Sequence, residues 1–424
     1  MYSVFLYFCS MKQITWVQRL QYFCLLLLSF VIPLNRRFFP PVFAVYVLLV
    51  LCEGSFKTKW RRMRERHYLL IFVGYLILYG SYVVGLLWSH NYPFAYRDLL
   101  LKLPFLLFPL CLFTSYECLF TYRRLLSLMY SFVSGCLLYS LYVCYVWIFK
   151  VGVNGLGSAF QISGSGYVMH HSYISMCYVL AVAIVFYLFL HERLKGWCKC
   201  LLALVAILLI FQIVVFSSRT AWIVSALLLL SFAVYLLVQT FRKRVRPYVS
   251  VLFFTMIVGT VLFVLCLPSN YNRCLQTFNN VKKEGTFRAA DVRWSIWECS
   301  WDVIGEHPIF GVGTGDVRDS LTQKQIEAGL PSFNSHNQFL NTWVAVGIVG
   351  LLAFVMILVL SVRQAVRNRS FLYFVFIMIV VGNCMTEAIL EKQTGLVFFV
   401  FFNTYLYCFV AENRTMIQKN DFCS

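Results

Sequence analysis

The sequence predicts an all-helical protein that crosses a membrane about twelve times, and three observations lead to this fold class. Hydrophobic residues make up 61% of the 424-residue chain and charged residues only 12%. The mean hydropathy is +0.75. Apolar stretches long enough to cross the roughly 30 Å hydrocarbon core of a bilayer as helices recur along the chain. A water-soluble fold of this composition would have no place for its apolar surface, so we expect a polytopic membrane protein.

The predicted spans account for most of the chain. They cover residues 15–32, 38–51, 68–88, 98–115, 125–149, 170–190, 200–217, 220–239, 249–267, 339–361, 371–388 and 394–411. Many Trp and Tyr residues stand near the ends of these runs, where a ring with one polar edge suits the headgroup zone of a bilayer. One long loop, at 268–338, separates the ninth predicted span from the tenth.

The formal net charge of +19 does not indicate a nucleic-acid partner, because Lys and Arg are distributed over alternate loops and not over one contiguous surface. If the N-terminus is inside, the cytoplasmic segments hold 22 of the 36 Lys and Arg residues, against seven in the short loops of the other side. The other seven lie in the loop at 268–338, where the positive-inside rule carries little weight. We therefore expect both termini in the cytoplasm and the long loop outside it.

The sixteen cysteines suggest a disulfide scaffold only until they are placed on the sequence. Most lie within or beside predicted spans, where Cys behaves as a small apolar residue. Only Cys274 and Cys299 fall in the long loop. A disulfide between these two residues is one alternative, and unpaired thiols are the default.

No familiar catalytic motif is present. The chain has no HExxH motif, no Walker A loop and no pair of carboxylates at helical spacing, so we expect neither a metal nor a cofactor. Function is therefore sought among polar residues in positions that are energetically costly in a membrane. Three of them stand out, namely Arg219, Arg293 and His336.

Arg219 follows Ser217 and Ser218 and precedes Thr220. Apolar runs flank this segment on both sides and leave only a very short connection between two spans, so Arg219 must lie at or near the membrane surface. An Arg in this position is costly unless it pairs with or binds an anion. The three neighbouring hydroxyls could join the five guanidinium donors around phosphate oxygens. The alternative is an Arg that only reaches the lipid headgroups from a turn between two spans.

Arg293 begins a stretch in which Trp294, Trp297, Trp301 and Ile304 recur at spacings of three and four, the pattern of a helix. The Trp stripe predicts a helix that packs on the bilayer surface. Arg293 is off the stripe, so it either points toward a ligand or is solvated.

His336 stands where the long loop re-enters the membrane. A loop histidine is often just a hydrogen-bonding residue. If His336 and Arg219 lie at the same opening on the membrane surface, however, an imidazole is suited to remove a proton from a hydroxyl. We expect His170 and His171, at the start of the sixth span, to point to different sides of a helix and to be structural.

Two further segments are polar or rich in glycine. Glu387 and Glu391, with Lys392, Gln393 and Thr394, form a polar break between the last two spans. The default is that these residues compensate one another or pair with one of the arginines, and a catalytic carboxylate is the alternative. Residues 306–316 carry several glycines but do not follow a strand, so they predict a tight turn and not a nucleotide site, with His307 structural.

The order of the short motifs resembles the O-antigen ligase and O-antigen polymerase superfamily. The motifs are Ser-Ser-Arg-Thr-Ala at 217–221, Arg-Trp-Ser-Ile-Trp at 293–297, His-Pro-Ile-Phe-Gly-Val-Gly at 307–313 and Ser-His-Asn-Gln-Phe-Leu at 335–340. The resemblance is close over 200–360, and residues 386–395 are similar to a segment found in some members. We accordingly divide the chain into N-terminal transmembrane helices at 1–199, a ligase-like core at 200–361, and C-terminal helices with a cytoplasmic tail at 362–424.

The resemblance implies a membrane glycosyltransferase of GT-C-like architecture in the bacterial inner membrane, with its active site facing the periplasm. Such an enzyme moves a glycan from undecaprenyl diphosphate to an acceptor hydroxyl without a metal. The acceptor is lipid A core in a ligase and another lipid-linked glycan in a polymerase. The expected partners are therefore these two substrates and membrane lipids, with no nucleic acid.

The resemblance also implies roles for individual residues. Arg219 and Arg293 match the diphosphate-binding arginines of the family, and His336 matches its catalytic histidine. Independently of the resemblance, the polar residues beside these three are candidates for supporting roles, namely Ser217, Ser218, Thr220, Asn337, Glu387 and Glu391. An O-antigen ligase is the preferred prediction, and an O-antigen or capsule polymerase is the alternative. A transporter or flippase for lipid-linked glycans is the alternative from another class, for which broken helices or internal repeats would be expected.

Overall fold

The computed structural model describes residues 15–34, 37–54, 56–65, 68–115, 117–151, 168–192, 194–215, 237–238, 240–241 and 292–421, and the regular elements in these ranges are helices. They are α2 (Trp16–Val31), α3 (Phe39–Cys52), α4 (Phe56–Glu65), α5 (Leu69–Val84), η1 (Gly85–Trp88), α6 (Tyr92–Lys102), α7 (Pro104–Phe113), η2 (Glu117–Phe120), α8 (Tyr122–Val146), η3 (Trp147–Val151), α10 (His171–His191), α11 (Gly196–Val215), α16 (Val292–Glu306), α17 (Val317–Glu327), α18 (Gln338–Arg367), α19 (Phe371–Cys384), η4 (Ile389–Glu391) and α20 (Gln393–Asp421).

Each predicted apolar stretch that falls on described residues is helical. Six of the described helices are long and apolar enough to cross a membrane, or seven if α3 and α4 form one bent span. The stretch 249–267 and most of 220–239 lie outside the described residues. An all-helical polytopic membrane protein is therefore confirmed, and the number of twelve spans stays a prediction.

One predicted span is divided in the structure. The stretch 98–115 belongs to two short helices, α6 and α7, which are separated at Leu103. Pro104 occupies the first position of α7, where a residue without an N–H is tolerated but cannot continue the hydrogen bonding of α6. Lys102 at the end of α6 is fully buried, so this segment is not a simple lipid-facing span.

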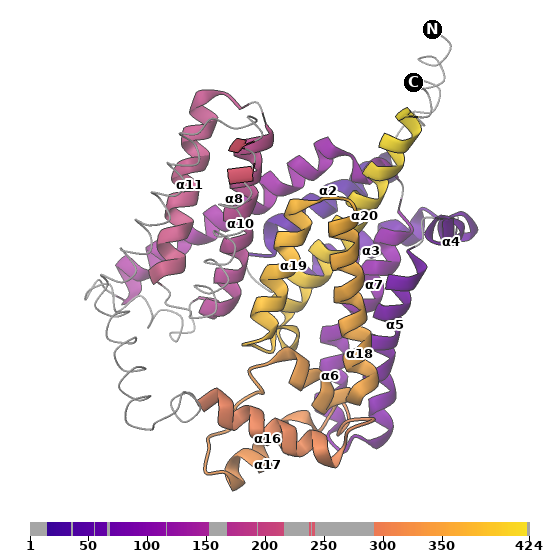
Figure 1. Cartoon of the computed structure of the whole chain (residues 1–424), viewed down its shortest axis with the longest axis vertical. Helices are drawn as coiled ribbons and strands as arrows, with labels where there is room; N and C mark the ends of the chain where they lie inside the picture. The colour runs from indigo at the N-terminus through magenta and orange to yellow at the C-terminus, as the bar shows by residue number, and fades with distance from the viewer. Residues whose placement is uncertain are drawn as a thin grey trace.

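The bundle has two different ends. Helices α16 and α17 lie together below the lower ends of α18 and α19 in Figure 1, whereas the C-terminal end of α20 lies at the opposite end. Between these ends α20 runs through the core, where Asn403 donates a hydrogen bond to the Tyr75 hydroxyl (2.8 Å) and accepts one from Tyr373 (2.9 Å). These bonds join α5, α19 and α20, and they satisfy polar groups that would be costly to bury alone.

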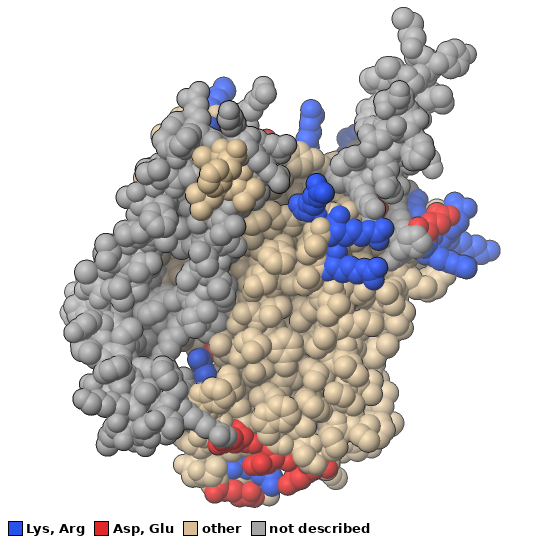
Figure 2. Space-filling view, viewed as in Figure 1, with Lys and Arg blue, Asp and Glu red and all other residues tan. Residues whose placement is uncertain are grey.

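Charge differs between the two ends. On the face shown in Figure 2, acidic side chains gather at the end formed by α16 and α17, and Lys and Arg gather toward the other end. The acidic residues of α16, α17 and the connection between them are Glu298, Asp302, Glu306, Asp316, Asp319 and Glu327. This distribution is the one expected if the end with α16 and α17 faces away from the cytoplasm.

Helix α18 contains a break that the sequence did not predict. Val346 and Gly347 have non-helical backbone angles, with φ +68° at Gly347. The glycine-rich segment enters this break, because Val312 N–H donates to the Val344 carbonyl (2.8 Å) and Ile348 N–H donates to the Pro308 carbonyl (3.1 Å).

A Cβ atom at Gly347 would lie 1.9 Å from the Ile309 carbonyl oxygen, so the close approach requires glycine. The glycine-rich segment therefore fixes the N-terminal part of α18, whose first residue follows directly after His336 and Asn337.

Candidate functional site

Arg293 and His336, which the sequence singled out separately, meet at one carboxylate. Glu387 lies in the loop between α19 and η4, where Oε2 is 3.2 Å from His336 Nδ1 and Oε1 is 3.5 Å from Arg293 Nη2. Ser172 Oγ, near the start of α10, is also 3.5 Å from Oε1. The structure thus brings together groups from α10, α16, the loop before α18 and the loop after α19.

Burial and charge act in opposite directions on Glu387, whose side chain is 8% exposed. Burial alone would raise the pKa of this carboxyl. The hydrogen bond from His336 and the positive charges of His336, Arg293 and His170 outweigh that effect, and the pKa lies below its ordinary value of 4.5. Glu387 is therefore an ionised carboxylate at neutral pH, able to hold an imidazole and a guanidinium at once.

The backbone at His336 has an unusual conformation. Its φ is +44°, a left-handed value that non-glycine residues rarely adopt. Two neighbours maintain it, since Asn334 Oδ1 accepts from the His336 N–H (3.0 Å) and Asn337 caps α18 by accepting from Phe339 and Leu340 N–H (2.9 and 3.2 Å). Backbone strain of this kind is concentrated at functional sites, where surrounding contacts hold it in place.

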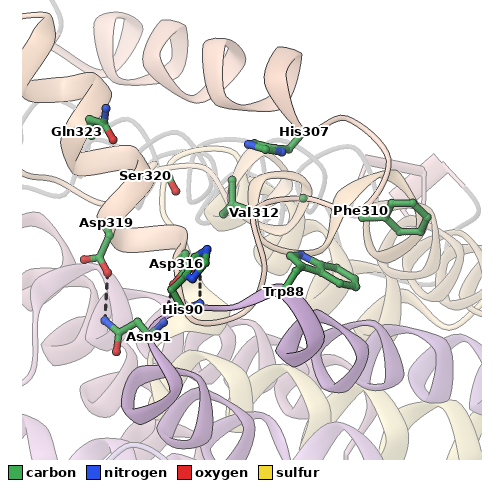
Figure 3. Close-up of a pocket in the computed structure, with 11 residues that line it drawn as sticks. Trp88, His90, Asn91, His307, Phe310, Val312, Asp316, Asp319, Ser320 and Gln323 are labelled. Carbon is green, nitrogen blue, oxygen red and sulfur yellow. Dashed lines mark hydrogen bonds between the residues drawn. The ribbon is translucent and has the colours of Figure 1, made fainter.

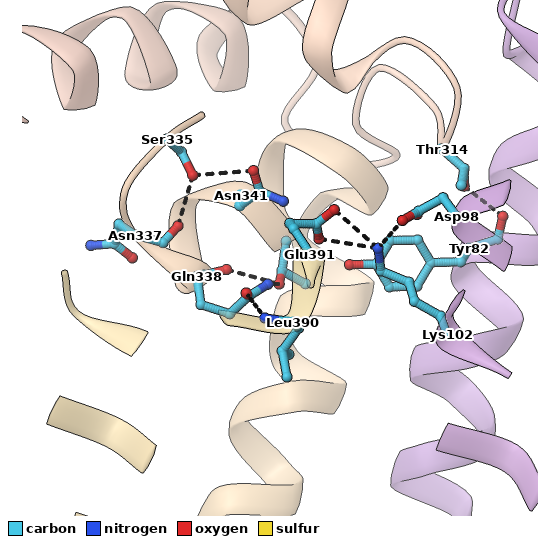
Figure 4. Close-up of polar contacts among 11 residues, drawn as sticks. Tyr82, Asp98, Lys102, Thr314, Ser335, Asn337, Gln338, Asn341, Leu390 and Glu391 are labelled. Carbon is cyan, nitrogen blue, oxygen red and sulfur yellow. Dashed lines mark hydrogen bonds and ion pairs between the residues drawn. The ribbon is translucent and has the colours of Figure 1, made fainter. Parts of the chain in front are cut away.

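The supporting residue Asn337 thus acts through the backbone, as the N-cap of α18. Ser335 adds to this arrangement, because its hydroxyl donates to the Asn337 carbonyl (2.9 Å) and lies 3.1 Å from Asn341 Oδ1. Figure 4 shows these bonds beside the start of α18. The direction of the His336 side chain is consequently set by the first turn of a buried helix.

A second polar group connects α18 to the loop that carries Glu387. Gln338 Oε1 accepts from the Leu390 N–H (2.7 Å), and one residue later Glu391 forms an ion pair with Lys102 (3.1 Å) (Figure 4). Lys102 also pairs with Asp98 and lies over the Tyr82 ring, with 4.6 Å from Nζ to the centroid.

Lys102 is fully buried, so removing both of its carboxylate partners would leave a buried charge without compensation, at about 3–5 kcal/mol. This network holds the segment from 387 to 391 against the rest of the bundle.

The arrangement can accept a proton and bind an anion. When His336 Nδ1 carries its hydrogen and donates it to Glu387, the other ring nitrogen is unprotonated and can take a proton from a hydroxyl. The side chains of Arg293 and His336 are each 26% exposed, so both are accessible from one side. A base beside a partly exposed guanidinium suits the displacement of an anionic leaving group by a hydroxyl.

Comparison with known proteins adds an independent observation. Residues 203–355 match the family model for O-antigen ligase. Over this part of its length the chain is similar to the O-antigen ligase superfamily. It is 28% identical over 187 residues to the ComP-specific O-oligosaccharyltransferase of Acinetobacter baylyi, an alignment that covers 42% of this chain and 32% of that protein.

It is also 30% identical over 96 residues to an uncharacterized protein of Haemophilus influenzae, over 21% of this chain and 24% of that one. The aligned parts span at most a third of the length of these two relatives.

The O-antigen ligase match contains Arg219, Arg293 and His336, whereas Glu387 and Lys102 lie outside it. The carboxylate that joins the arginine to the histidine therefore comes from a part of the chain that the family model does not cover. The match also includes the helix break at Gly347, which fixes the end of α18 next to His336.

Several predicted residues of this O-antigen ligase relative lie outside the described part of the chain, namely Ser217, Ser218, Arg219, Thr220 and Cys274. Their roles stay predictions. Cys299 is a buried free thiol whose Sγ lies 3.7 Å from the Lys324 carbonyl oxygen. Among the described residues no three His, Cys, Asp or Glu side chains gather in a way that could hold a metal ion.

Two expectations need correction. Glu391 forms the expected ion pair, but its partner is Lys102 and not Lys392 or an arginine, because Lys102 reaches it from α6. The rings of His170 and His171 do not point to different sides of a helix, since their centroids are 4.0 Å apart. The reason is that His170 is the N-cap of α10 with ψ 138°, outside the helix, so helical spacing does not apply to it.

The Trp stripe of α16 has the predicted helical spacing, but only part of it faces outward. Trp294 and Trp301 are exposed, at 43% and 51%, while Ile304 is buried with Ile296 in the face that packs on the bundle. A position on the bilayer surface stays a prediction for the two exposed rings. Arg293 is off this stripe, as expected, and points to Glu387.

Sequence reasoning missed Asp98 and Lys102. They stand four residues apart at the edge of an apolar stretch, and a charged pair there is costly unless it is compensated. That spacing was a usable signal for a buried ion pair. The third partner, Glu391, is 289 residues from Lys102, and no local pattern indicates this contact.

Proposed function

We propose that the protein transfers a glycan from undecaprenyl diphosphate to an acceptor hydroxyl on the periplasmic side of the bacterial inner membrane. The preferred acceptor is lipid A core, as in an O-antigen ligase. The observation that carries the proposal is the contact of Glu387 with both Arg293 and His336, at 3.5 and 3.2 Å. A base and an anion-binding group are thereby held on one carboxylate, in a chain whose relatives include an O-oligosaccharyltransferase.

In this proposal His336 removes the proton of the acceptor hydroxyl as the new glycosidic bond forms. Glu387 acts as a positioning residue. Its carboxylate accepts the Nδ1 hydrogen, keeps the opposite ring nitrogen free to accept, and stabilises the imidazolium that forms. This division of work between carboxylate and imidazole is the general logic of a histidine base with an orienting acid.

Arg293 and Arg219 are proposed to bind the diphosphate that leaves. Displacement of a diphosphate creates negative charge, and guanidinium groups stabilise that charge through paired N–H donors. Arg293 now contacts Glu387 at 3.5 Å, longer than a strong charge-assisted hydrogen bond. A donor diphosphate would therefore compete with the carboxylate for Arg293 and would leave Glu387 to His336.

A polymerase of the same superfamily would perform the same displacement on another lipid-linked glycan. A transporter for lipid-linked glycans belongs to a different class and needs no base. The buried carboxylate beside His336 favours an enzyme, because a transport path gives no reason to hold an imidazole in a strained backbone conformation.

An enzyme is distinguished from a transporter by measuring transfer of labelled glycan from its lipid carrier, in proteoliposomes that contain only this protein. An enzyme produces glycosylated acceptor, with Arg318→Ala on the exposed face of α17 as a control for loss of surface charge. A transporter moves label across the bilayer without forming product. Offering lipid A core and lipid-linked repeat units as separate acceptors distinguishes a ligase from a polymerase.

A further inference from the structure

A second recess lies at the end of the bundle that carries α16 and α17, away from His336. It is a cavity of about 820 Å³ between the η1–α6 connection and the segment 307–323. Figure 3 shows its lining, which includes the rings of Trp88 and Phe310, the imidazole of His307, and the polar side chains of Asp319 and Gln323. None of these residues takes part in the contacts around Glu387.

The walls of this cavity are held rigidly. Asp316 accepts hydrogen bonds from the backbone N–H groups of His90 and Asn91, both at 2.8 Å, and Asn91 donates to Asp319 at 3.1 Å. Behind the lining, Thr314 donates to the Tyr82 carbonyl (2.6 Å). These bonds join two segments more than 220 positions apart, so the cavity is part of the fold and not a gap between mobile loops.

The lining combines aromatic faces with hydrogen-bonding groups. Trp88 and Phe310 form an edge-to-face pair with centroids 5.8 Å apart, and the Phe310 ring is 62% exposed. The face of the Phe310 ring is thus available for stacking, and Trp88 supports it from the side. Trp88 Nε1 is buried and has no hydrogen-bond partner among the described residues.

The charge of the lining selects the kind of ligand. Asp316 and Asp319 are acidic, and no Lys or Arg belongs to the lining. A phosphate group would meet like charge there and no guanidinium to compensate it. Hydroxyl groups, by contrast, can donate to Asp319 and both donate to and accept from Gln323, while the C–H face of a sugar ring packs on an aromatic ring.

The rim of the cavity indicates where such a ligand comes from. Leu87 and Ile309 stand beside it with exposed fractions of 80% and 56%. Exposed apolar side chains next to Trp88 are suited to the boundary between hydrocarbon and headgroups. Such a rim is the one expected of a cavity that receives the sugars of a membrane-anchored glycan.

We propose that this cavity is a saccharide-binding subsite for an uncharged part of a membrane-anchored glycan, with Phe310 as the stacking ring and Asp319 and Gln323 as the hydroxyl-binding groups. The proposal rests on the proposed function for the source of the glycan. The binding itself does not require transfer, so the two can be tested separately.

Purified protein in detergent is applied to an array of bacterial oligosaccharides that carry neither lipid nor diphosphate. We expect binding to at least one uncharged glycan, and a loss of affinity of about fivefold or more in Phe310→Ala and in Gln323→Ala. Ile326→Ala is the control for loss of an exposed apolar side chain, because Ile326 on α17 is 65% exposed and lies outside the lining. Thr322→Ala is the control for Gln323, because Thr322 is on the same helix, lies outside the lining, and bonds to Ser332 (2.7 Å) and not to Gln323.

Competition with glycan freed from the donor or from the acceptor then identifies the source. The absence of binding to any uncharged glycan would overturn the proposal, as would binding that is equal in the cavity variants and the controls. If His336→Ala abolishes transfer but leaves glycan binding intact, the subsite and the transfer reaction are separate. If the wild type binds glycan but transfers none, the proposed transfer function is contradicted and the saccharide-binding subsite is still supported.

Discussion

His336 Nδ1 lies 3.2 Å from Glu387 Oε2, although the two residues are 51 positions apart in the chain. This contact makes Glu387 a positioning residue for the proposed base. We expect Glu387→Gln to lower the rate of glycan transfer by at least about tenfold while donor affinity changes little, because the amide keeps the shape but loses the charge that stabilises the imidazolium. Turnover and donor affinity are measured separately, with Glu298→Gln on α16 as the control. Unchanged turnover in Glu387→Gln would remove this role.

The same carboxylate makes stability depend on pH. The pKa of Glu387 is lowered in the folded protein from its ordinary value of 4.5, since the hydrogen bond from His336 and nearby positive charge outweigh burial. Its contribution to the free energy of unfolding is therefore complete above about pH 4.5 and is lost as the pH falls through the lowered value. The difference in melting temperature between wild type and Glu387→Gln should be constant near neutrality and shrink in acid. A difference that grows in acid would contradict the sign of the pKa shift.

Lysine should replace neither Arg219 nor Arg293 if both bind the donor diphosphate. A planar guanidinium binds phosphate oxygens through paired donors, and an ammonium group cannot reproduce that geometry. We expect Arg219→Lys and Arg293→Lys to reduce transfer, with Arg318→Lys on α17 unaffected. Membrane protein levels are compared to exclude misfolding. An Arg that only reaches the headgroups would keep its function as Lys, so full activity in both variants would exclude the diphosphate role.

Chelation tests whether the arginines, and not a bound divalent metal ion, stabilise the charge of the leaving diphosphate. Because no carboxylate or histidine cluster with metal-ligand spacing was found in the sequence, we expect activity to survive EDTA. The assay uses purified protein in proteoliposomes, with and without chelator. Loss of transfer that added magnesium or manganese restores would show that a divalent ion is needed.

Orientation in the membrane is tested with a reporter that is active only outside the cytoplasm. The acidic end of the molecule in Figure 2, and the 22 Lys and Arg residues in the opposite set of segments, predict that a fusion near Gly315 is active and one near Lys243 is inactive. The reverse pattern would place the proposed site in the cytoplasm.

Hydropathy predicted the described helices well, because a spanning helix needs a continuous apolar run. It could not show the break at Gly347, since a window average treats one glycine in an apolar stretch as neutral. The break exists because the segment around Pro308 donates and accepts backbone hydrogen bonds there, and that segment lies far away in sequence.

The sequence also predicted part of the candidate site. His336 and Arg293 were identified from short motifs, which depend on neighbours in sequence. Their meeting at Glu387, and the pairing of Glu391 with Lys102, depend on how distant helices pack, so they required the structure. Glu387 had been expected to form an ion pair, and its simultaneous contact with the histidine changes what that carboxylate is proposed to do.

The central claim is that His336 is the base in glycan transfer. It is tested most directly by measuring transfer of labelled glycan by wild type and His336→Ala in proteoliposomes, with donor binding measured in parallel. We expect turnover to fall by roughly 10²–10⁴ while donor binding stays nearly intact, because Arg293 is still present. Transfer at the wild-type rate by His336→Ala would show that the histidine is only structural and would contradict the mechanism.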